Sequence, residues 1–234
     1  MSQNQVKIEK SQLFDGIEIK SATFINKNFP LHFHQSWSLA CVEHGSENIS
    51  FENSSFMLSK RALILIPPYS VHRHWGNENS AWGYKAIYLN SDVIKSVAQN
   101  VNIDCSYLES FPYFIAYVEN GFEINEITIF DLLKKLFLEA VADSSYSTSM
   151  RYKEAHFEEI LSYLSQHFNE SITLDGLEKK FKINKFNLQK NFKKKIGLTP
   201  AEYLTATRIE NSKKLFFTGS TLTEIALESG FYDQ

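Results

Sequence analysis

The first part of the chain, from residue 12 to residue 89, consists of short hydrophobic segments separated by turn-forming residues. Three segments are rich in apolar, β-branched or aromatic residues: Trp37–Glu43, Ala62–Ile66 and Tyr84–Leu89. The turn-forming residues lie at His44–Ser46, Glu52–Ser54, Pro67–Pro68 and Gly76–Asn77. Many short strands at such spacing are typical of antiparallel barrels and sandwiches. The pattern therefore predicts an antiparallel β domain.

After residue 90 the hydrophobic spacing becomes helical. Apolar side chains cover about half of the circumference of one predicted helix, and they are Ile129, Phe130, Leu132, Leu133, Leu136, Phe137, Ala140 and Val141. An ordinary surface helix needs an apolar stripe of only about 100°. Contact with a second subunit and burial under the β domain explain the excess equally well. On the first explanation, residues 124–141 form the interface of a homodimer.

From Arg151 onward the spacing is helical throughout. A first amphipathic helix follows the i, i+3, i+4 rule through Phe157, Ile160, Leu161, Leu164 and Phe168. Thr173 offers an N-cap for a short helix whose apolar residues are Leu174, Leu177 and Phe181. Asn184 offers an N-cap for the next helix, which ends at Gly197 and turns inward Leu188, Phe192 and Ile196. Two helices joined by a short turn predict a helix-turn-helix.

Composition excludes several classes of protein. Hydrophobic residues make up 43% of the 234 residues and charged residues 22%, which is close to the average of globular proteins and excludes fibrous or wholly disordered chains. No run of 18 apolar residues and no signal peptide is present, so no membrane partner is expected. Cys41 and Cys105 are too few and too far apart for a disulfide framework or a metal clip. These features predict a cytoplasmic protein.

Charge divides the chain into two parts. The net charge is −3 overall, but residues 151–234 carry +2 and the preceding residues −5. Residues 143–150 are polar and aperiodic, and we interpret them as a linker between domains 1–142 and 151–234. Eight lysines and no acidic residue lie between Lys179 and Lys195.

This basic segment coincides with the second helix of the predicted helix-turn-helix. Such a helix enters the major groove of double-stranded DNA, so the segment predicts an operator as the partner. Side chains near its N-terminus are candidates for base contacts, namely Lys185, Asn187 and Gln189. Candidates for phosphate contacts follow at Lys190, Lys193, Lys194 and Lys195. The alternative is that the lysines form only a solvated helix face.

The second half also resembles the AraC-type (arabinose-operon regulator) transcription factors. The motifs that carry the resemblance are Leu174-x-x-Leu177, Leu188-x-x-x-Phe192-Lys193, Gly197-Leu-Thr-Pro200-x-x-Tyr203-Leu204, Arg208-Ile209 and Thr223-Glu-Ile-Ala226-x-x-x-Gly230-Phe231-x-Asp233. They span residues 172–234 almost continuously. The resemblance implies two helix-turn-helix units joined by a long helix, here Ala201–Phe217. It also implies that Thr223–Gly230 forms the first helix and turn of the second unit.

The sequence departs from this family at three places. Glu178 stands where the family usually has Ala at a helix crossing, so its charge must point outward or loosen the packing. Lys182 stands where a turn glycine is usual, which requires a positive φ at a non-glycine residue. The chain stops at Gln234, where the second recognition helix would begin. We therefore expect a truncated second unit that is poorly ordered around residues 219–234, and weak operator binding.

In the first half, His32-x-His34, Gly45 and Pro67-Pro68-x-x-x-His72 resemble the sensor domain of a subgroup of this family. The fold class implied is α+β: an N-terminal antiparallel β-barrel (cupin-like) with C-terminal helices, followed by an all-α helix-turn-helix domain. Related barrels that bind metal add a Glu shortly after the HxH pair, and here Gln35–Leu39 follow instead. His32, His34 and His72 are therefore expected to face a ligand or to make hydrogen bonds, with a three-imidazole metal site as the alternative.

A barrel interior can hold one small molecule, so the first half predicts a sensor of a small-molecule effector. With the three histidines, the expected effector-binding residues are Trp37, His74, Trp82 and Tyr84, and Tyr69 and Trp75 are further candidates for the pocket wall. No catalytic motif and no cofactor is predicted.

The sequence as a whole predicts a one-component, sequence-specific transcriptional regulator. In this interpretation the effector changes the packing or dimer geometry of the barrel, and so the presentation of the DNA-binding helices. Two alternatives come from other classes: a metal-dependent cupin enzyme with a helical appendage, and an interaction module whose helices bind protein.

Overall fold

The computed structural model describes residues 4–11, 17–109, 111–118, 125, 128–142 and 155–232. By internal contacts the chain divides into two compact units, Met1–Arg151 and Tyr152–Gln234. The predicted linker, residues 143–150, lies outside the described residues.

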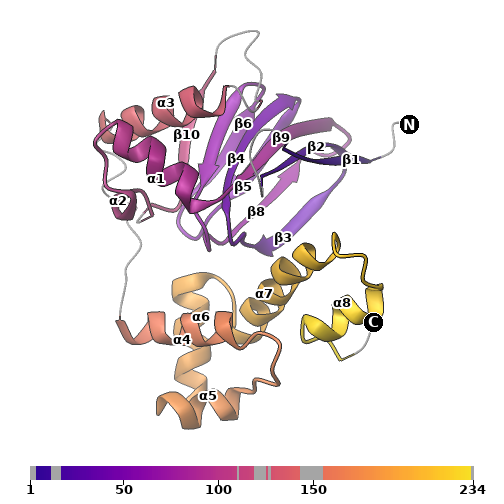
Figure 1. Ribbon diagram of the computed structural model, residues 1–234, viewed down its shortest axis with the longest axis vertical. Helices are drawn as coiled ribbons and strands as arrows, with labels where there is room; N and C mark the ends of the chain where they lie inside the picture. The colour runs from indigo at the N-terminus through magenta and orange to yellow at the C-terminus, as the bar shows by residue number, and fades with distance from the viewer. Residues whose placement is uncertain are drawn as a thin grey trace. The chain divides into compact units, whose positions relative to one another are not determined.

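The first unit is a sandwich of two antiparallel sheets (Figure 1). Its strands are β1 (Gln5–Lys10), β2 (Glu18–Ile25), β3 (Asn28–His32), β4 (Trp37–His44), β5 (Ser46–Ser50), β6 (Ser55–Ser59), β7 (Ala62–Ile66), β8 (His72–Gly76), β9 (Ala81–Leu89) and β10 (Phe114–Tyr117). One sheet has the order β1-β2-β9-β4-β7-β10 and the other β3-β8-β5-β6. The expected α+β class with an antiparallel β domain is confirmed.

Alternation along the central strands gives the six-stranded sheet two apolar faces. In β7, Leu63 and Leu65 join one core cluster, whereas Ala62, Ile64 and Ile66 join another that also contains residues of β5 and β6. The second cluster therefore lies between the two sheets. The first lies on the outer face, where the helices pack.

The first unit also contains three helices, α1 (Ser91–Asn100), α2 (Cys105–Glu109) and, after β10, α3 (Ile129–Ala142). Figure 1 shows them on one side of the six-stranded sheet. Ile94, Val97 and Ala98 of α1 are fully buried in the outer cluster. The side chain of Asn90 caps α1 by accepting a hydrogen bond from the backbone N–H of Val93 at 3.0 Å.

The wide apolar arc of residues 129–141 is mostly buried within this unit. Six of its side chains belong to the outer cluster with exposures of 2% or less: Ile129, Leu132, Leu133, Leu136, Phe137 and Ala140. Val141, together with the neighbouring Leu138, is more than half exposed. Burial against the sheet therefore explains most of the arc, and a small apolar surface remains on α3.

The second unit is all-helical. Its helices are α4 (Ala155–Gln166), α5 (Leu174–Phe181), α6 (Lys185–Ile196), α7 (Pro200–Leu215) and α8 (Leu222–Glu228). Phe192 is the centre of the core: it is fully buried, and its ring centroid lies 5.0 Å from that of Phe157 and 5.5 Å from that of Tyr203. Ile160, Leu164, Leu177 and Leu188 complete this core from α4, α5 and α6. Among the described residues, no helix is both long and apolar enough to cross a membrane.

Arg208 of α7 fixes the chain segment after α4. Its Nε donates to the carbonyl of Phe168 at 2.8 Å, and its other guanidinium N–H group donates to the carbonyl of Glu170 at 2.9 Å. Gly230 packs against the same segment with φ +82°, and a Cβ there would lie 2.7 Å from Cα of Asn169. A side chain at position 230 would therefore be both strained and blocked. The residues of the family motif that lie far apart in sequence are thus in contact here.

Candidate functional site

The start of α6 is held by two side chains. The Asn184 side chain accepts hydrogen bonds from the backbone N–H groups of Phe186 and Asn187, at 3.1 and 3.3 Å. Oε1 of Glu178 accepts one from the backbone N–H of Lys185 at 3.1 Å. Three N–H groups that a helix terminus leaves unsatisfied therefore have partners. The predicted N-cap is confirmed, and Glu178 gains a function that its sequence position did not indicate.

The turn between α5 and α6 contains the predicted positive φ. Lys182 ends α5 in the left-handed region with φ +53° and ψ +37°. This conformation costs a non-glycine residue free energy, but it directs the chain into α6. Gly197 ends α6 with φ +82°, as expected for a C-terminal glycine. Lys182 therefore sets the direction of the turn between the two helices, and Gly197 sets the end of α6.

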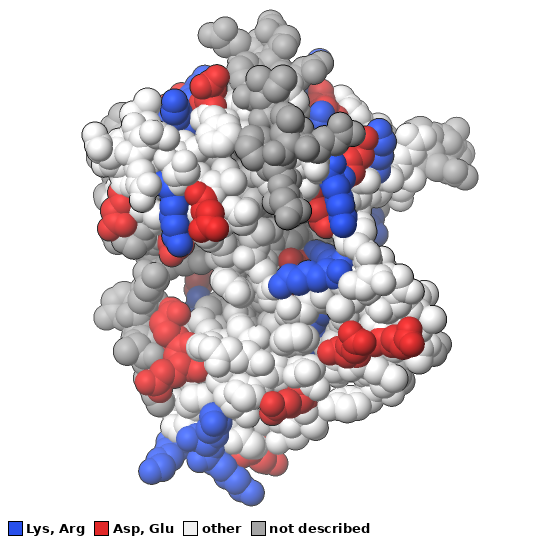
Figure 2. Space-filling model, viewed as in Figure 1, with Lys and Arg blue, Asp and Glu red and all other residues white. Residues whose placement is uncertain are grey.

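The exposed surface of α6 carries most of the predicted DNA-binding residues. Asn187, Gln189, Lys190, Lys193 and Lys194 are exposed, and Lys195 is half-buried with its Nζ 5.2 Å from the centre of the Phe157 ring. Phe186 also lies on this surface, 71% exposed. Phe186 was not among the predicted residues. Its position two places after the predicted N-cap Asn184 is the sequence feature that could have identified it. Figure 2 shows further basic side chains gathered over α5, whose last turn carries Lys179 and Lys180.

Two of the predicted DNA-binding lysines have acidic partners within the unit. Nζ of Lys185 lies 2.7 Å from Oδ1 of Asp175, and this bond raises the pKa of Lys185 and lowers that of Asp175. Nζ of Lys193 lies 3.2 Å from Oε2 of Glu202. The pKa of Glu202 is lowered, first by the hydrogen bond from the backbone N–H of Thr199. The charges of Lys185 and Lys193 are therefore partly neutralised.

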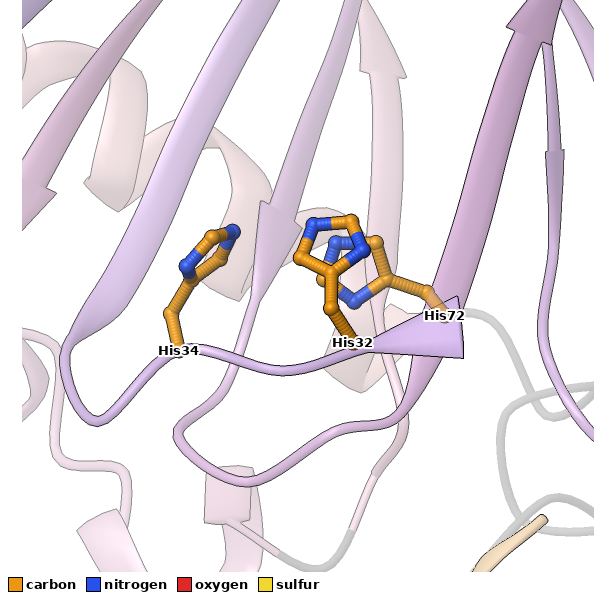
Figure 3. A group of neighbouring side chains, drawn as sticks. All are labelled: His32, His34 and His72. Atoms are coloured by element: carbon orange, nitrogen blue, oxygen red, sulfur yellow. The ribbon is translucent and has the colours of Figure 1, made fainter. Parts of the chain in front are cut away.

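In the first unit, three predicted histidines come together (Figure 3). His32 ends β3, His34 follows it, and His72 begins β8, which pairs with β3. The ring centroids of His32 and His72 are 4.4 Å apart, and that of His34 lies 5.0 Å from the first and 5.4 Å from the second. One ring nitrogen of each lies within 4.8 Å of the other two. We call these residues the histidine cluster.

Burial favours the neutral form of the His72 imidazole, the most buried ring of the cluster. His72 is only 3% exposed, and burial lowers its pKa well below the usual 6.5, with further lowering by His32, His34 and His74. A buried imidazole loses the hydration of its charged form, and neighbouring imidazoles repel a second charge.

The aromatic candidates divide between the two faces of the large sheet. Trp82 and Tyr84 of β9 lie in an inner cluster, with His74 stacked on the Phe29 ring at 4.2 Å between centroids. Burial raises the pKa of Tyr84. The Glu47 side chain is also buried, and its Oε1 lies 3.4 Å from Nδ1 of His74. These residues surround a polar interior of the sandwich.

Trp37 does not belong to this interior. It is fully buried in the outer cluster, against the helices, because alternation along β4 turns it and Leu39 away from the other sheet. Tyr69 is 41% exposed, and Trp75 is half-buried with the guanidinium of Arg73 5.0 Å from its ring centre. Trp37 is therefore a core residue outside the candidate effector pocket, whereas Tyr69 and Trp75 stay candidates for the pocket wall.

A β sandwich with a polar interior, joined in one chain to a helix-turn-helix with an exposed basic helix, defines the class of ligand-responsive DNA-binding regulators. Comparison with known families agrees: the model for the AraC-like ligand binding domain matches residues 16–161, and a helix-turn-helix domain model matches residues 177–234. The chain belongs to the AraC family of transcriptional regulators.

Individual relatives are distant but match along most of the chain. The HTH-type transcriptional regulator YbfI of Bacillus subtilis is 24% identical, over 95% of this chain and 87% of the relative. The HTH-type transcriptional activator RhaS of Citrobacter koseri is 22% identical, over 88% of this chain and 80% of the relative. The solved structure of ToxT from Vibrio cholerae has the same fold, with a TM-score of 0.61 at 14% identity, and covers 93% of this chain and 90% of that one. These relatives favour the regulator over the enzyme alternative.

Proposed function

We propose that α6 is the helix of this regulator that enters the major groove. The single observation that carries the proposal is its capped N-terminus, which presents exposed Asn187 and Gln189 beside exposed Lys190 and Lys194. Amide side chains pair bidentately with adenine, and Phe186 offers an apolar surface for the thymine methyl group. Lys190, Lys193, Lys194 and Lys195 would contact phosphates.

Lys185 has a different place in this proposal. Its ion pair with Asp175 links the first turn of α6 to α5, so we propose that it positions the helix. A base contact by Lys185 would require that pair to open. Exposed pairs of this kind contribute little to stability, so phosphate or base can compete for the ammonium group.

We propose that the sandwich interior binds the effector. The wall would be formed by His32, His34, His72, His74, Trp82 and Tyr84, which are the predicted residues that face this interior. One of the solved ToxT structures is described as bound to an unsaturated fatty acid. A structural neighbour that binds a small molecule supports a binding function, rather than catalysis, for this chain.

We also propose that the protein acts in the cytoplasm as a homodimer through residues 124–141. Support for the dimer comes from the exposed Leu138 and Val141 on α3. Positions 124, 126 and 127 of this interface lie outside the described residues.

The proposal for α6 is tested by selecting duplexes from a random DNA library and measuring affinity at several salt concentrations. Lys190→Ala should weaken binding to every duplex and reduce the slope of log K against log salt by about 1, because one phosphate contact is lost. Gln189→Ala should instead change discrimination by roughly 1–3 kcal/mol at one base pair. Lys95→Ala, an equal change of charge on exposed α1, is the control. Equal affinity and slope for wild type and both α6 variants would exclude α6 as the reading helix.

A further inference from the structure

The rings of the histidine cluster lie close together. Figure 3 shows the rings of His32 and His34 on the same side of the segment that carries them, and the His72 ring reaching from its own strand to the ring of His32. Among the described residues this group consists of imidazoles alone, with donor nitrogens within 4.8 Å of one another. Strand β3 ends at His32 and its neighbour β8 begins at His72, and these two residues are paired directly, whereas His34 follows β3. The approach of the His32 and His72 rings is therefore fixed by backbone pairing.

Two of the rings are held in the tautomer that a metal requires. Nδ1 of His32 is 2.8 Å from the carbonyl oxygen of Pro30, and Nδ1 of His72 is 2.8 Å from that of Ser70. A carbonyl oxygen can only accept, so each Nδ1 carries the hydrogen. In the neutral ring the lone pair then belongs to Nε2. Imidazoles that bind metal ions are usually oriented in this way, with the second nitrogen donating to a carbonyl or carboxylate.

Aromatic rings enclose the cluster on two sides. The centroid of Tyr88 lies 5.1 Å from that of His34, and the centroid of Phe51 lies 5.8 Å from that of His72. Tyr88 belongs to β9 and Phe51 directly follows β5, so both rings are supplied by the sandwich itself. Such an apolar surround also strengthens a coordinate bond, because water competes less well there.

The donor set determines which class of ion fits. Calcium and magnesium are bound by oxygen atoms, which this group does not supply. Imidazole nitrogen suits zinc, copper, nickel and iron. Ligand distances of about 2.0–2.1 Å bring tetrahedral nitrogens to roughly 3.3 Å from one another. The nitrogens of the cluster lie within 4.8 Å of one another, so they must approach more closely to bind one ion. Half-buried His32 and His34 can do so by side-chain rotation, while buried His72 stays in place.

We propose that His32, His34 and His72 bind one divalent transition-metal ion of the zinc class through three imidazole nitrogens, with the remaining coordination position open to solvent or to a ligand. This goes beyond the proposed regulatory function. An anion held by protonated imidazoles is the competing occupant. The tautomers favour the metal, because two Nε2 lone pairs in the cluster attract a cation and repel an anion.

The test is a titration of the full chain, prepared without a histidine tag and freed of metal by a chelator that is then removed. Co²⁺ serves as the probe, because its visible absorption reports the coordination number. We expect saturable binding of one Co²⁺ per chain, displacement by Zn²⁺, and a rise in the melting temperature with either ion. His32→Ala and His34→Ala should each weaken binding by more than the roughly 100-fold that loss of an outer-shell partner can cost.

His167→Ala is the matched control, since its ring lies in the other unit, where Nδ1 is 2.7 Å from Glu170. It should bind Co²⁺ like the wild type. The two cluster variants replace half-buried residues, and circular dichroism checks whether each of them folds. Retention of the ion by both variants, absence of saturable binding, or a melting temperature that rises with phosphate or acetate but with neither metal ion would each overturn the proposal. No DNA enters this measurement, so its failure is distinct from failure of the proposed function.

Discussion

At the scale of single residues, Glu178 shows how a departure from a family pattern acquires a role. A carboxylate at a helix crossing was expected to point outward or loosen the packing. Instead Glu178 is half-buried, and its Oε1 accepts a hydrogen bond from the N–H of Lys185 and one from the side chain of Asn184 at 3.5 Å. An acceptor at a helix N-terminus is favourable also because of the helix dipole.

Replacement of Glu178 should therefore destabilise the helical unit. We expect Glu178→Ala to lower the free energy of unfolding by about 1 kcal/mol, the usual effect of losing a capping acceptor, and to weaken DNA binding through a less ordered α6. Urea denaturation and a binding titration measure the two effects. Glu228→Ala, at the exposed end of α8, is the control. If both variants were equally stable, the Glu178 bonds would have no energetic importance.

The two cysteines should differ in reactivity. Burial, followed by the negative charge of Glu43, raises the pKa of Cys41 to about 11, whereas Cys105 is half-buried and its pKa is raised first by burial. The reactive species is the thiolate, which is scarce and shielded at Cys41. We expect iodoacetamide at pH 8 to modify Cys105 first, and Cys41 only after unfolding, as read by mass spectrometry. Equal rates in the native protein would contradict the burial of Cys41.

At the scale of elements, α7 begins with a reciprocal cap. Thr199 accepts from the backbone N–H of Glu202 at 3.2 Å, and Glu202 accepts from the backbone N–H of Thr199 at 2.7 Å. Pro200 occupies the first position of the helix, where no N–H is needed. Together with the Lys193 ion pair, this cap joins α6 to the start of α7.

This cap predicts a dependence of stability on acid. The pKa of Glu202 in the folded chain lies below its usual 4.5, so its ionised form stabilises the fold above that pH, and the contribution is lost as pH falls through the lowered pKa. Glu202→Gln should therefore be less stable than the wild type at pH 7, with a difference that shrinks below about pH 4.5. Thermal melts across this range measure it. A difference that stays constant with pH would show that charge plays no part.

At the scale of the whole molecule, the proposed dimer rests on α3. Most of its apolar arc is used inside the sandwich unit, so only Leu138 and Val141 remain for a partner. Leu138→Asp and Val141→Asp should each convert the dimer to a monomer in sedimentation, because a charge would be buried without a counter-ion. Met57→Asp, at an exposed apolar residue of β6, is the control. A monomeric wild type, or dimers in all variants, would refute this interface.

Much of the helical unit could be predicted from the sequence because its determinants are local. The N-caps Thr173 and Asn184 and the C-terminal Gly197 act on backbone groups within a few residues, and the i, i+3, i+4 spacing identified Leu188 and Phe192 as core. The positive φ of Lys182 was expected because Lys182 stands where the family usually has a turn glycine. The predicted joining helix, 201–217, differs from α7 by one or two residues at its ends.

Tertiary structure decided what depends on segments distant in the chain. The pairing of β3 with β8 brings together His32 and His72, which are 40 positions apart in the sequence. Trp37 is a core residue because its face of the sheet is the one that the helices cover. The partners of Lys185 and Lys193 lie on other helices, at Asp175 and Glu202. Hydrophobic periodicity reports which side of an element is buried, but the neighbour that covers it is chosen only when the whole chain packs.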